Sequence, residues 1–431
     1  MLRVDYPLFK PLQTLDQTVA KAPKAGRIVF IDVLRAYAIL MMLQGHFVDT
    51  LLAEQFRNPE SILYYVWSFM RGMTAPIFFT VTGLVFVFLL LRDGRPMREN
   101  TRMKKGIRRG FFLLYIGYLL KVNFPALLVG YLSPWILAID VLHIIGVALI
   151  GLIAICALRE LIGGSLAIWM LAFGAGTFLI DPFFTENSWA ETPRFFAHYL
   201  TRDFGSNFTI VPWLGFAFFG GALGAIINKR PQWAFSHLMP ILLLAFGITL
   251  TYGSWQMLVN LYELTGWEYL PVLFNNNYLF WRLGHVFIVM AIFMWGIPRI
   301  GKIPVLITKI GSETLTIYGV HYIILYGTWL GLGLSQIIGY RTLAPVPCII
   351  GAVIFVFAHI MLIKHIEPLR QIWYVQIPGW FKRQYRMAMV WWKREWPRQR
   401  AALLLQWQDW LAGAPNWLLP LVRVMSRKTK D

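Results

Sequence analysis

The chain has 431 residues, of which 58% are hydrophobic and only 14% are charged. Soluble domains carry about 25% charged residues, so this composition excludes an ordinary soluble protein and indicates an integral membrane protein. The net charge of +19 could suggest nucleic-acid binding. The basic residues, however, cluster in short segments between apolar runs, as in the cytoplasmic loops of membrane proteins. We therefore expect no nucleic-acid partner.

Apolar runs long enough to cross a bilayer, about 20 residues each, recur along the whole chain. They predict an all-α, polytopic membrane bundle with one transmembrane domain. The ten predicted membrane-spanning helices lie near residues 28–52, 62–91, 110–129, 138–158, 161–181, 210–228, 235–259, 278–298, 310–334 and 345–366. We therefore expect three parts, which are a segment at 1–27, a transmembrane domain at 28–366 and a tail at 367–431.

The distribution of charged residues between the predicted helices gives an orientation. Residues 92–109 contain eight lysine or arginine residues against Asp93 and Glu99, and such basic loops stay in the cytoplasm. This places both ends of the chain, segment 1–27 included, on the cytoplasmic side. Acidic residues between helices, such as Asp181, then fall on the far side. We expect a protein of the bacterial cytoplasmic (inner) membrane.

The tail after Lys364 has a different composition. Tryptophan residues alternate there with lysine and arginine residues, and the apolar runs are too short to span a bilayer. Tryptophan with basic residues suits an amphipathic helix that lies in the headgroup layer. We predict that residues 367–431 bind the lipids of the cytoplasmic leaflet and act as an anchor, not as a catalytic element.

The predicted helix at 28–52 carries its ionisable residues on a single face. At about 100° per residue, the step from Arg35 to His46 returns to within about 20° of the starting direction. Asp32 lies one turn before Arg35, and Asp49 lies one turn after His46, so one stripe of the helix is charged or titratable. Ionisable residues at membrane depth are costly and mark functional paths. The stripe therefore predicts a protected cavity, although Asp32 and Arg35 alone could be a structural ion pair.

The separation of Arg35 and His46 suits a long anionic cofactor. A rise of 1.5 Å per residue places the two residues about 16 Å apart along the helix. A cation at the cytoplasmic end would hold phosphate groups, and the imidazole at the other end would act as general base or nucleophile. Arg108 and Arg109, in the basic segment, are further candidates for cofactor binding.

Other polar residues are predicted near the outer half of the same bundle. Arg71, Asp140 and His321 lie within apolar runs, where we assign the first two to catalysis and His321 to cofactor binding. Asp140 or Asp49 could orient His46, and Arg71 could stabilise a developing oxyanion. No spacing of histidine, cysteine or acidic residues offers a convincing set of metal ligands, so we expect no metal.

The order of residues in the first predicted helix resembles the transmembrane acyltransferase superfamily. That pattern is an aspartate, then Arg35, ten intervening residues and His46. The sequence is most similar to the branch of heparan-alpha-glucosaminide N-acetyltransferase and its bacterial relatives, with the acyltransferase 3 family more distant. The likeness continues through MTAPIFFTVTG, DVLHIIGVAL, VPWLGFAFFGGALG and IGSETLTIYGVHY, and so covers most of residues 27–366. Ala36 departs from it, because the family usually has glycine after the arginine.

The resemblance implies transfer of an acyl group, often acetyl from acetyl-CoA, to a sugar on the far side of the membrane. It implies that His46 is the catalytic histidine and that Arg35 is linked to the acyl donor. Asp32 would fill the family's acidic position in the same helix, and we count it among the catalytic residues. Acyl-CoA is then the expected co-substrate, and a sugar or glycan is the expected acceptor.

Two other functions remain open from the sequence. Intramembrane acidic, basic and histidine residues also form proton relays, so the main alternative is a proton-coupled transporter or a flippase of lipid intermediates. Many secondary transporters contain duplicated halves, and no such repeat is visible in this chain. The third possibility is a degenerate member with only a structural or regulatory role. The acceptor, the acyl chain, an acyl-histidine intermediate and the oligomeric state are left open as well.

Overall fold

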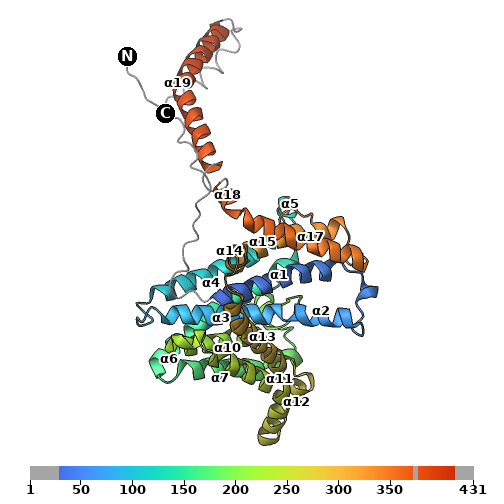
Figure 1. The fold of residues 1–431 in the computed structure, drawn as a ribbon. Helices are drawn as coiled ribbons and strands as arrows, with labels where there is room; N and C mark the ends of the chain where they lie inside the picture. The colour runs from blue at the N-terminus through green and yellow to red at the C-terminus, as the bar shows by residue number, and fades with distance from the viewer. Residues whose placement is uncertain (1–28, 372–376, 413–431) are drawn as a thin grey trace. The chain divides into compact units, whose positions relative to one another are not determined.

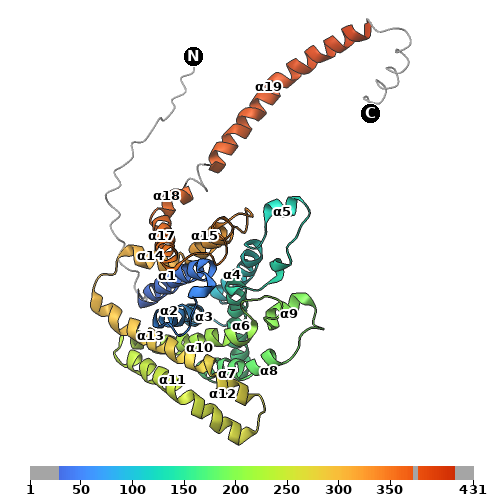
Figure 2. The ribbon, with the colours of Figure 1, turned by 90° about the vertical axis from the view of Figure 1, so that its right-hand side faces the viewer.

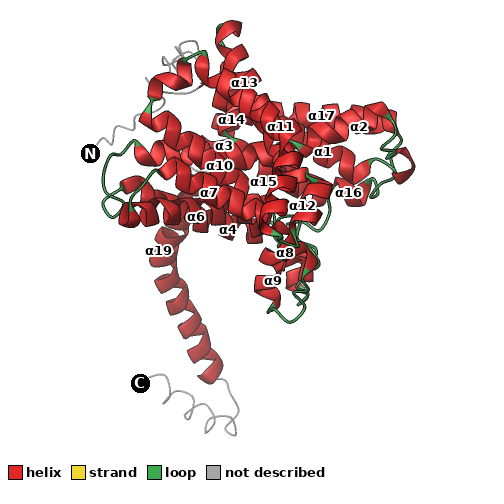
Figure 3. Cartoon of the chain, turned by 90° about the horizontal axis from the view of Figure 1, so that it is seen from below, coloured by secondary structure: helices red, strands yellow, loops and turns green. Residues whose placement is uncertain are grey.

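The computed structural model describes residues 29–371 and 377–412 of the chain (Figure 1). The predicted cytoplasmic segment 1–27, and residues 372–376 and 413–431 of the predicted tail, lie outside the described residues. Within the described ranges every regular element is a helix, joined to the next by loops and turns (Figure 3). The predicted all-α fold is therefore confirmed.

The helices alternate with short connections along the described part of the chain. In chain order the α-helices are α1 (Val29–Leu51), α2 (Ile62–Gly72), α3 (Thr74–Leu91), α4 (Thr101–Leu119), α5 (Phe124–Leu128), α6 (Val141–Ile162), α7 (Leu166–Leu179), α8 (Asp181–Glu186), α9 (Arg194–Leu200), α10 (Ile210–Lys229), α11 (Leu238–Thr265), α12 (Leu270–Asn276), α13 (Tyr278–Ile300), α14 (Val305–Ser312), α15 (Thr314–Tyr326), α16 (Leu334–Ile337), α17 (Pro345–Lys364), α18 (Ile366–Gln371) and α19 (Ile377–Ala412). Three short 3-10 helices lie between them, η1 (Glu54–Phe56), η2 (Pro134–Leu137) and η3 (Pro231–Phe235).

Eight helical segments among the described residues are long and apolar enough to cross a membrane. They are Val29–Leu51, Ile62–Leu91, Pro134–Ile162, Leu166–Glu186, Ile210–Lys229, Leu238–Thr265, Tyr278–Ile300 and Pro345–Lys364. Each corresponds to one of the ten spans predicted from the sequence. The protein is therefore an integral membrane protein with a polytopic helical bundle.

The predicted span 110–129 differs from the helix that forms there. Helix α4 begins at Thr101 and ends at Leu119, so its first turns lie in the basic segment and lower its hydropathy. Asn100 fixes this early start, because its side chain caps the helix by accepting hydrogen bonds from two backbone N–H groups of the first turn. The expected loop at 92–109 is accordingly helical in its second half.

The predicted span 310–334 is divided between two helices. Helix α14 ends at Ser312 and α15 begins at Thr314, and both helices are shorter than the eight candidate spans. Helix α14 packs closely on α1, since a Cβ atom on Gly311 would lie 1.9 Å from the carbonyl oxygen of Asp32. This contact holds α15, the helix that follows, beside the ionisable face of α1.

Glycine residues let several other helices approach one another closely. A Cβ atom on Gly110 of α4 would lie 2.9 Å from the carbonyl oxygen of Gly146 on α6, and one on Gly83 of α3 would lie 1.8 Å from that of Ala217 on α10. Small residues at helix contacts are typical of membrane bundles, where van der Waals packing drives association. Helices α11 and α13 lie side by side in the same way (Figure 2).

The segment 62–91 is interrupted between Gly72 and Thr74. Helix α2 ends at Gly72 and α3 begins at Thr74. Pro76 follows in the first turn of α3, a position where the missing N–H of proline is tolerated, so a new helix begins here. The interruption leaves Arg71 in the last turn of α2.

The chain divides into two compact units, Met1–Ile363 and Lys364–Asp431. The described part of the second unit consists of α18 and α19. On α19 the exposed rings of Trp392 and Trp396 stack with their centroids 4.5 Å apart, among exposed basic residues. This composition is the one predicted for a helix in the headgroup layer, and lipid binding by the tail stays a prediction.

Candidate active site

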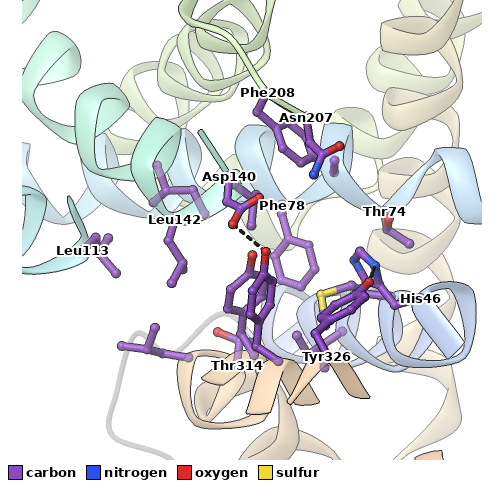
Figure 4. Close-up of a pocket in the computed structure, with 18 of the residues that line it drawn as sticks. His46, Thr74, Phe78, Leu113, Asp140, Leu142, Asn207, Phe208, Thr314 and Tyr326 are labelled. Atoms are coloured by element: carbon purple, nitrogen blue, oxygen red, sulfur yellow. Dashed lines mark hydrogen bonds between the residues drawn. The ribbon is translucent and has the colours of Figure 1, made fainter. Parts of the chain in front are cut away.

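A cavity of about 980 Å³ runs through the first unit along one face of α1 (Figure 4). Helix α1 contributes to its lining Arg35, Ile39, Met42, His46, Asp49 and Thr50. These positions share one face of a helix, and the first and last of them are about 22 Å apart along the axis. The other walls come from α3, α4, α6 and α15. Three of the four ionisable residues of the α1 stripe, Arg35, His46 and Asp49, therefore face a cavity, as the sequence predicts, whereas Asp32 does not line it.

The cavity meets exposed side chains at two ends. Arg109 of α4 is exposed and lines the end that holds Arg35. The other end is lined by exposed Gln336 and Tyr340. This connection contacts the end of α1, because the backbone N–H of Arg341 donates to the carbonyl of Thr50. Exposed residues therefore line the cavity at both of these ends.

The Arg35 end of the cavity carries two guanidinium groups, and Asp32, which does not line the cavity, interacts electrostatically with Arg35. The Arg35 guanidinium donates a hydrogen bond from Nη2 to Oγ1 of Thr314, at 3.1 Å, and lies close enough to Arg109 to interact with it electrostatically. Among the described lining residues the acidic side chains are Asp49 and Asp140, and both belong to the other half of the cavity. Two guanidinium groups without a lining carboxylate suit phosphate groups.

His46 lies in the middle of the cavity, fixed through one ring nitrogen. Its Nδ1 is 2.9 Å from the hydroxyl of Tyr326, and its ring is 5.3 Å from that of His321, measured between centroids. Since His321 is fully buried, it forms the wall behind the His46 ring. Among the described residues no hydrogen-bond partner of the other ring nitrogen, Nε2, is present, and the His46 side chain lines the cavity.

Tyr326 is a site residue that our interpretation of the sequence missed. Helix α15 contributes Tyr318, Tyr322 and Tyr326 to the cavity, four residues apart and therefore on one face. This regular tyrosine spacing in a predicted span is the signal that could have indicated them. Apolar residues on other helices, among them Phe78, Val81, Leu113 and Leu142, complete the walls.

Arg71 and Asp49 form an ion pair in the cavity. The Arg71 guanidinium donates to Oδ2 of Asp49, and the Arg57 guanidinium pairs with Oδ1 of the same carboxylate at 3.3 Å. The stem of Arg71 passes over Gly45, where a Cβ atom would lie 2.9 Å from its Cγ. The Asp49 carboxylate thus contacts Arg71 and Arg57, whereas the sequence offered it as one of two candidates for orienting His46.

Asp140 is also paired with groups other than His46. Its Oδ2 accepts a hydrogen bond from the Tyr322 hydroxyl at 2.7 Å (Figure 4) and lies 3.2 Å from Nζ of Lys121. The alternative expectation, that Asp140 orients His46, does not match these contacts. Lys121 was overlooked in the sequence, although a lone basic residue inside the predicted span 110–129 marks it as functional.

The structure thus brings five of the eight predicted site residues to one cavity, namely Arg35, His46, Arg71, Arg109 and Asp140. The remaining three do not line it. Asp32 lies behind Arg35 on α1, Arg108 is exposed on α4, and His321 is buried behind His46. Among the described residues, no group of three or more histidine, cysteine or acidic side chains is placed to hold a metal ion.

Comparison with known proteins places this chain in a family. No curated protein and no solved structure matches the sequence. Residues 28–365 match the acyltransferase 3 family, described as an acyltransferase domain, and this match covers the whole bundle that contains the cavity. The chain therefore belongs to the acyltransferase domain family and is an integral membrane acyltransferase.

Proposed function

We propose that the protein transfers an acyl group, acetyl in the first instance, from cytoplasmic acyl-CoA to a sugar on the far side of the bacterial inner membrane. One observation carries the proposal. A single cavity holds two arginine residues at one end, His46 further along and exposed residues at the other end. Donor and acceptor can therefore enter from opposite sides and meet at the imidazole.

The donor would occupy the Arg35 half of the cavity. Its nucleotide phosphates would pair with Arg35 and Arg109, and we leave Arg108 out of the site because it does not line the cavity. The thin pantetheine arm would pass the apolar residues Ile39 and Met42 of α1. His46 lies about 16 Å from Arg35 along the helix, which suits the reach of that arm to the thioester.

His46 would act as the general base. Nε2 takes the proton from a sugar hydroxyl or amine, whose oxygen or nitrogen attacks the thioester carbonyl. The new C–O or C–N bond forms as the C–S bond breaks, and the proton passes from the imidazole to the departing CoA thiolate. Acceptance of the acyl group by the imidazole itself is the two-step variant of the same chemistry. Tyr326 holds the ring through Nδ1 in either case.

The remaining predicted residues take supporting roles in this proposal. Arg71 stabilises the oxyanion that develops on the thioester carbonyl, and Asp49 positions it. Asp32 interacts electrostatically with Arg35 and so holds the phosphate-binding guanidinium. His321 forms the wall behind His46 and does not touch the donor. The resemblance of the first span to the heparan-alpha-glucosaminide N-acetyltransferase branch supports a sugar as acceptor.

Acyl transfer can be tested on the purified protein in detergent with radiolabelled acetyl-CoA and an extract of bacterial membrane lipids and glycans. We expect release of free CoA and label in the extract with the wild type, and neither with His46→Ala. A proton-coupled transporter, the alternative from the sequence, needs no donor turnover. Absence of His46-dependent CoA release from the wild type would therefore overturn the proposed function.

A further inference from the structure

A second polar cluster lines the cavity and has no part in the mechanism above. It consists of Lys121, Asp140 and Tyr322, with the carboxylate 3.2 Å from Lys121 Nζ and 2.7 Å from the Tyr322 hydroxyl. Lys121 Nζ also donates to the carbonyl oxygen of Ala138. The cluster comes from three separate parts of the chain, the end of α4, the start of α6 and the middle of α15.

Stability alone does not explain this cluster. The Lys121 side chain is 0% exposed and that of Asp140 is 7% exposed. Removing two charges from water costs several kcal/mol per ion, and their mutual attraction often does no more than offset that cost. Inside a membrane bundle, ionisable groups are rare and typically mark a substrate path.

Two exposed residues, Trp135 and Asn207, also line the cavity beside the cluster. The Trp135 ring lies 5.5 Å from Lys121 Nζ and remains 50% exposed. Asn207 is exposed and lines the same part of the cavity. Its loop is held in place because its backbone N–H donates to the carbonyl of Ile139. The result is an aromatic ring and an amide at the entrance, with an ion pair and a hydroxyl behind them.

The charges of the cavity differ between its two halves. The half beyond His46 is lined by two acidic residues, Asp49 and Asp140, and two basic residues, Arg71 and Lys121, so its formal charges sum to zero. The Arg35 half is lined by two basic residues and no acidic one. An anion is favoured in the Arg35 half, whereas the outer half favours a neutral ligand rich in hydrogen-bonding groups.

We infer that the cluster and its entrance form the acceptor subsite, and that the acceptor presents a neutral, polyhydroxylated sugar ring there. The inference rests on the proposed function, since it names the acceptor of that reaction. Ring hydroxyls pair with the Asp140 carboxylate, the Tyr322 hydroxyl and the Asn207 amide, while the apolar face of the ring packs on Trp135. Binding sites for small ligands usually combine an aromatic wall with a small number of polar groups that fix the ligand's orientation. A carboxylated sugar is disfavoured because it brings an unpaired charge to a site of balanced charge.

A photoreactive sugar tests the location and the chemistry of this subsite. The probe is a methyl glucoside that carries a diazirine, and labelled peptides are identified by mass spectrometry on the full-length protein in detergent. We expect label in residues 131–143 and 205–209, competed by methyl glucoside and about tenfold less well by methyl glucuronide. Trp135→Ala and Asn207→Ala should each lower the labelling, Trp135→Ala by about tenfold. The matched control is Trp255→Ala, since Trp255 is also 50% exposed and does not line the cavity.

Two outcomes would overturn the subsite. One is label elsewhere in the chain, and the other is equal competition by the neutral and the carboxylated sugar. Acetyl-CoA turnover is measured on the same samples to separate this test from the proposed function. Correct labelling without turnover would refute acyl transfer and leave a sugar site, whereas turnover with label elsewhere would refute the subsite and leave the transferase.

Discussion

The hydroxyl of Tyr326 lies 2.9 Å from Nδ1 of His46, although the two residues are 280 positions apart in the sequence. A hydrogen bond at Nδ1 fixes both the orientation of the imidazole ring and the nitrogen that faces the cavity. In familiar triads an acidic residue has this role. Here both nearby cavity carboxylates are engaged by basic residues, Asp49 by Arg71 and Asp140 by Lys121, and a neutral phenol takes their place.

Replacement of Tyr326 by phenylalanine tests this pairing. Tyr326→Phe keeps the aromatic wall and removes one hydrogen bond, worth about 1 to 1.5 kcal/mol. We expect kcat for acetyl transfer to fall about tenfold, while the Kd for acetyl-CoA stays unchanged because the donor is held elsewhere. Tyr318→Phe is the matched control, since it alters another cavity tyrosine of the same helix. An equal fall in kcat for Tyr326→Phe and Tyr318→Phe would contradict the assignment of Tyr326 as the residue that orients His46.

The positive end of the cavity gives a prediction about donor binding. Arg35→Gln and Arg109→Gln should each weaken binding of CoA by about 10- to 100-fold, because each removes a charge-assisted hydrogen bond of about 1.5 to 3 kcal/mol. Arg108→Gln should have little effect, since Arg108 is exposed and does not line the cavity. Equilibrium binding of radiolabelled CoA to each purified variant measures the difference. A loss with Arg108→Gln as large as with Arg109→Gln would contradict this placement.

Arg71 and Asp49 should behave as a unit in catalysis. Arg71→Gln removes the proposed oxyanion donor, and we expect kcat to fall by about 10² to 10³ with little change in CoA binding. Asp49→Asn weakens the ion pair that positions Arg71 and should cost less in kcat. The double variant should then be no slower than Arg71→Gln alone, which single-turnover measurements can check. Fully additive losses would show that the two residues act separately.

The close contact of α14 with α1 predicts an effect on stability. In Gly311→Ala the new methyl group would lie 1.9 Å from the carbonyl oxygen of Asp32, so the helices must move apart. We expect a loss of about 1 to 3 kcal/mol, as for overpacked sites in general, and a lower midpoint of thermal unfolding in detergent. Gly296→Ala is the control, because nothing lies within 4 Å of a Cβ atom there. An unchanged midpoint for Gly311→Ala would contradict the packing described here.

The sequence was sufficient for much of the fold and insufficient in two places. Long uniform apolar runs predicted the eight candidate spans, because burial in lipid requires helix over that length. Helix α4 spans Thr101–Leu119 and not the predicted 110–129, because the Asn100 cap starts the helix within the basic segment. Hydropathy does not show where a helix is capped. The predicted span 310–334 does not form one helix, because α14 ends at Ser312 and α15 spans Thr314–Tyr326, and a uniform apolar run does not show such a division.

The candidate site was predictable where its residues lie on one helix. The stripe from Arg35 to His46 follows from helical periodicity alone, and it does line the cavity. The partners of those residues were not predictable in this way. Tyr326 reaches His46, and Lys121 reaches Asp140, only through the packing of distant helices. The sequence offered Asp140 as one of two candidate partners of His46, whereas its carboxylate contacts Lys121 and Tyr322.

The central claim is that His46 performs the chemistry in a cavity that takes the acyl donor from one side. The most direct measurement compares wild type with His46→Ala and His46→Gln, recording acetyl transfer to the membrane extract, CoA binding and the thermal unfolding midpoint. We predict that both variants bind CoA and unfold like the wild type while transfer falls below detection. Transfer at the wild-type rate by either folded variant would contradict the account.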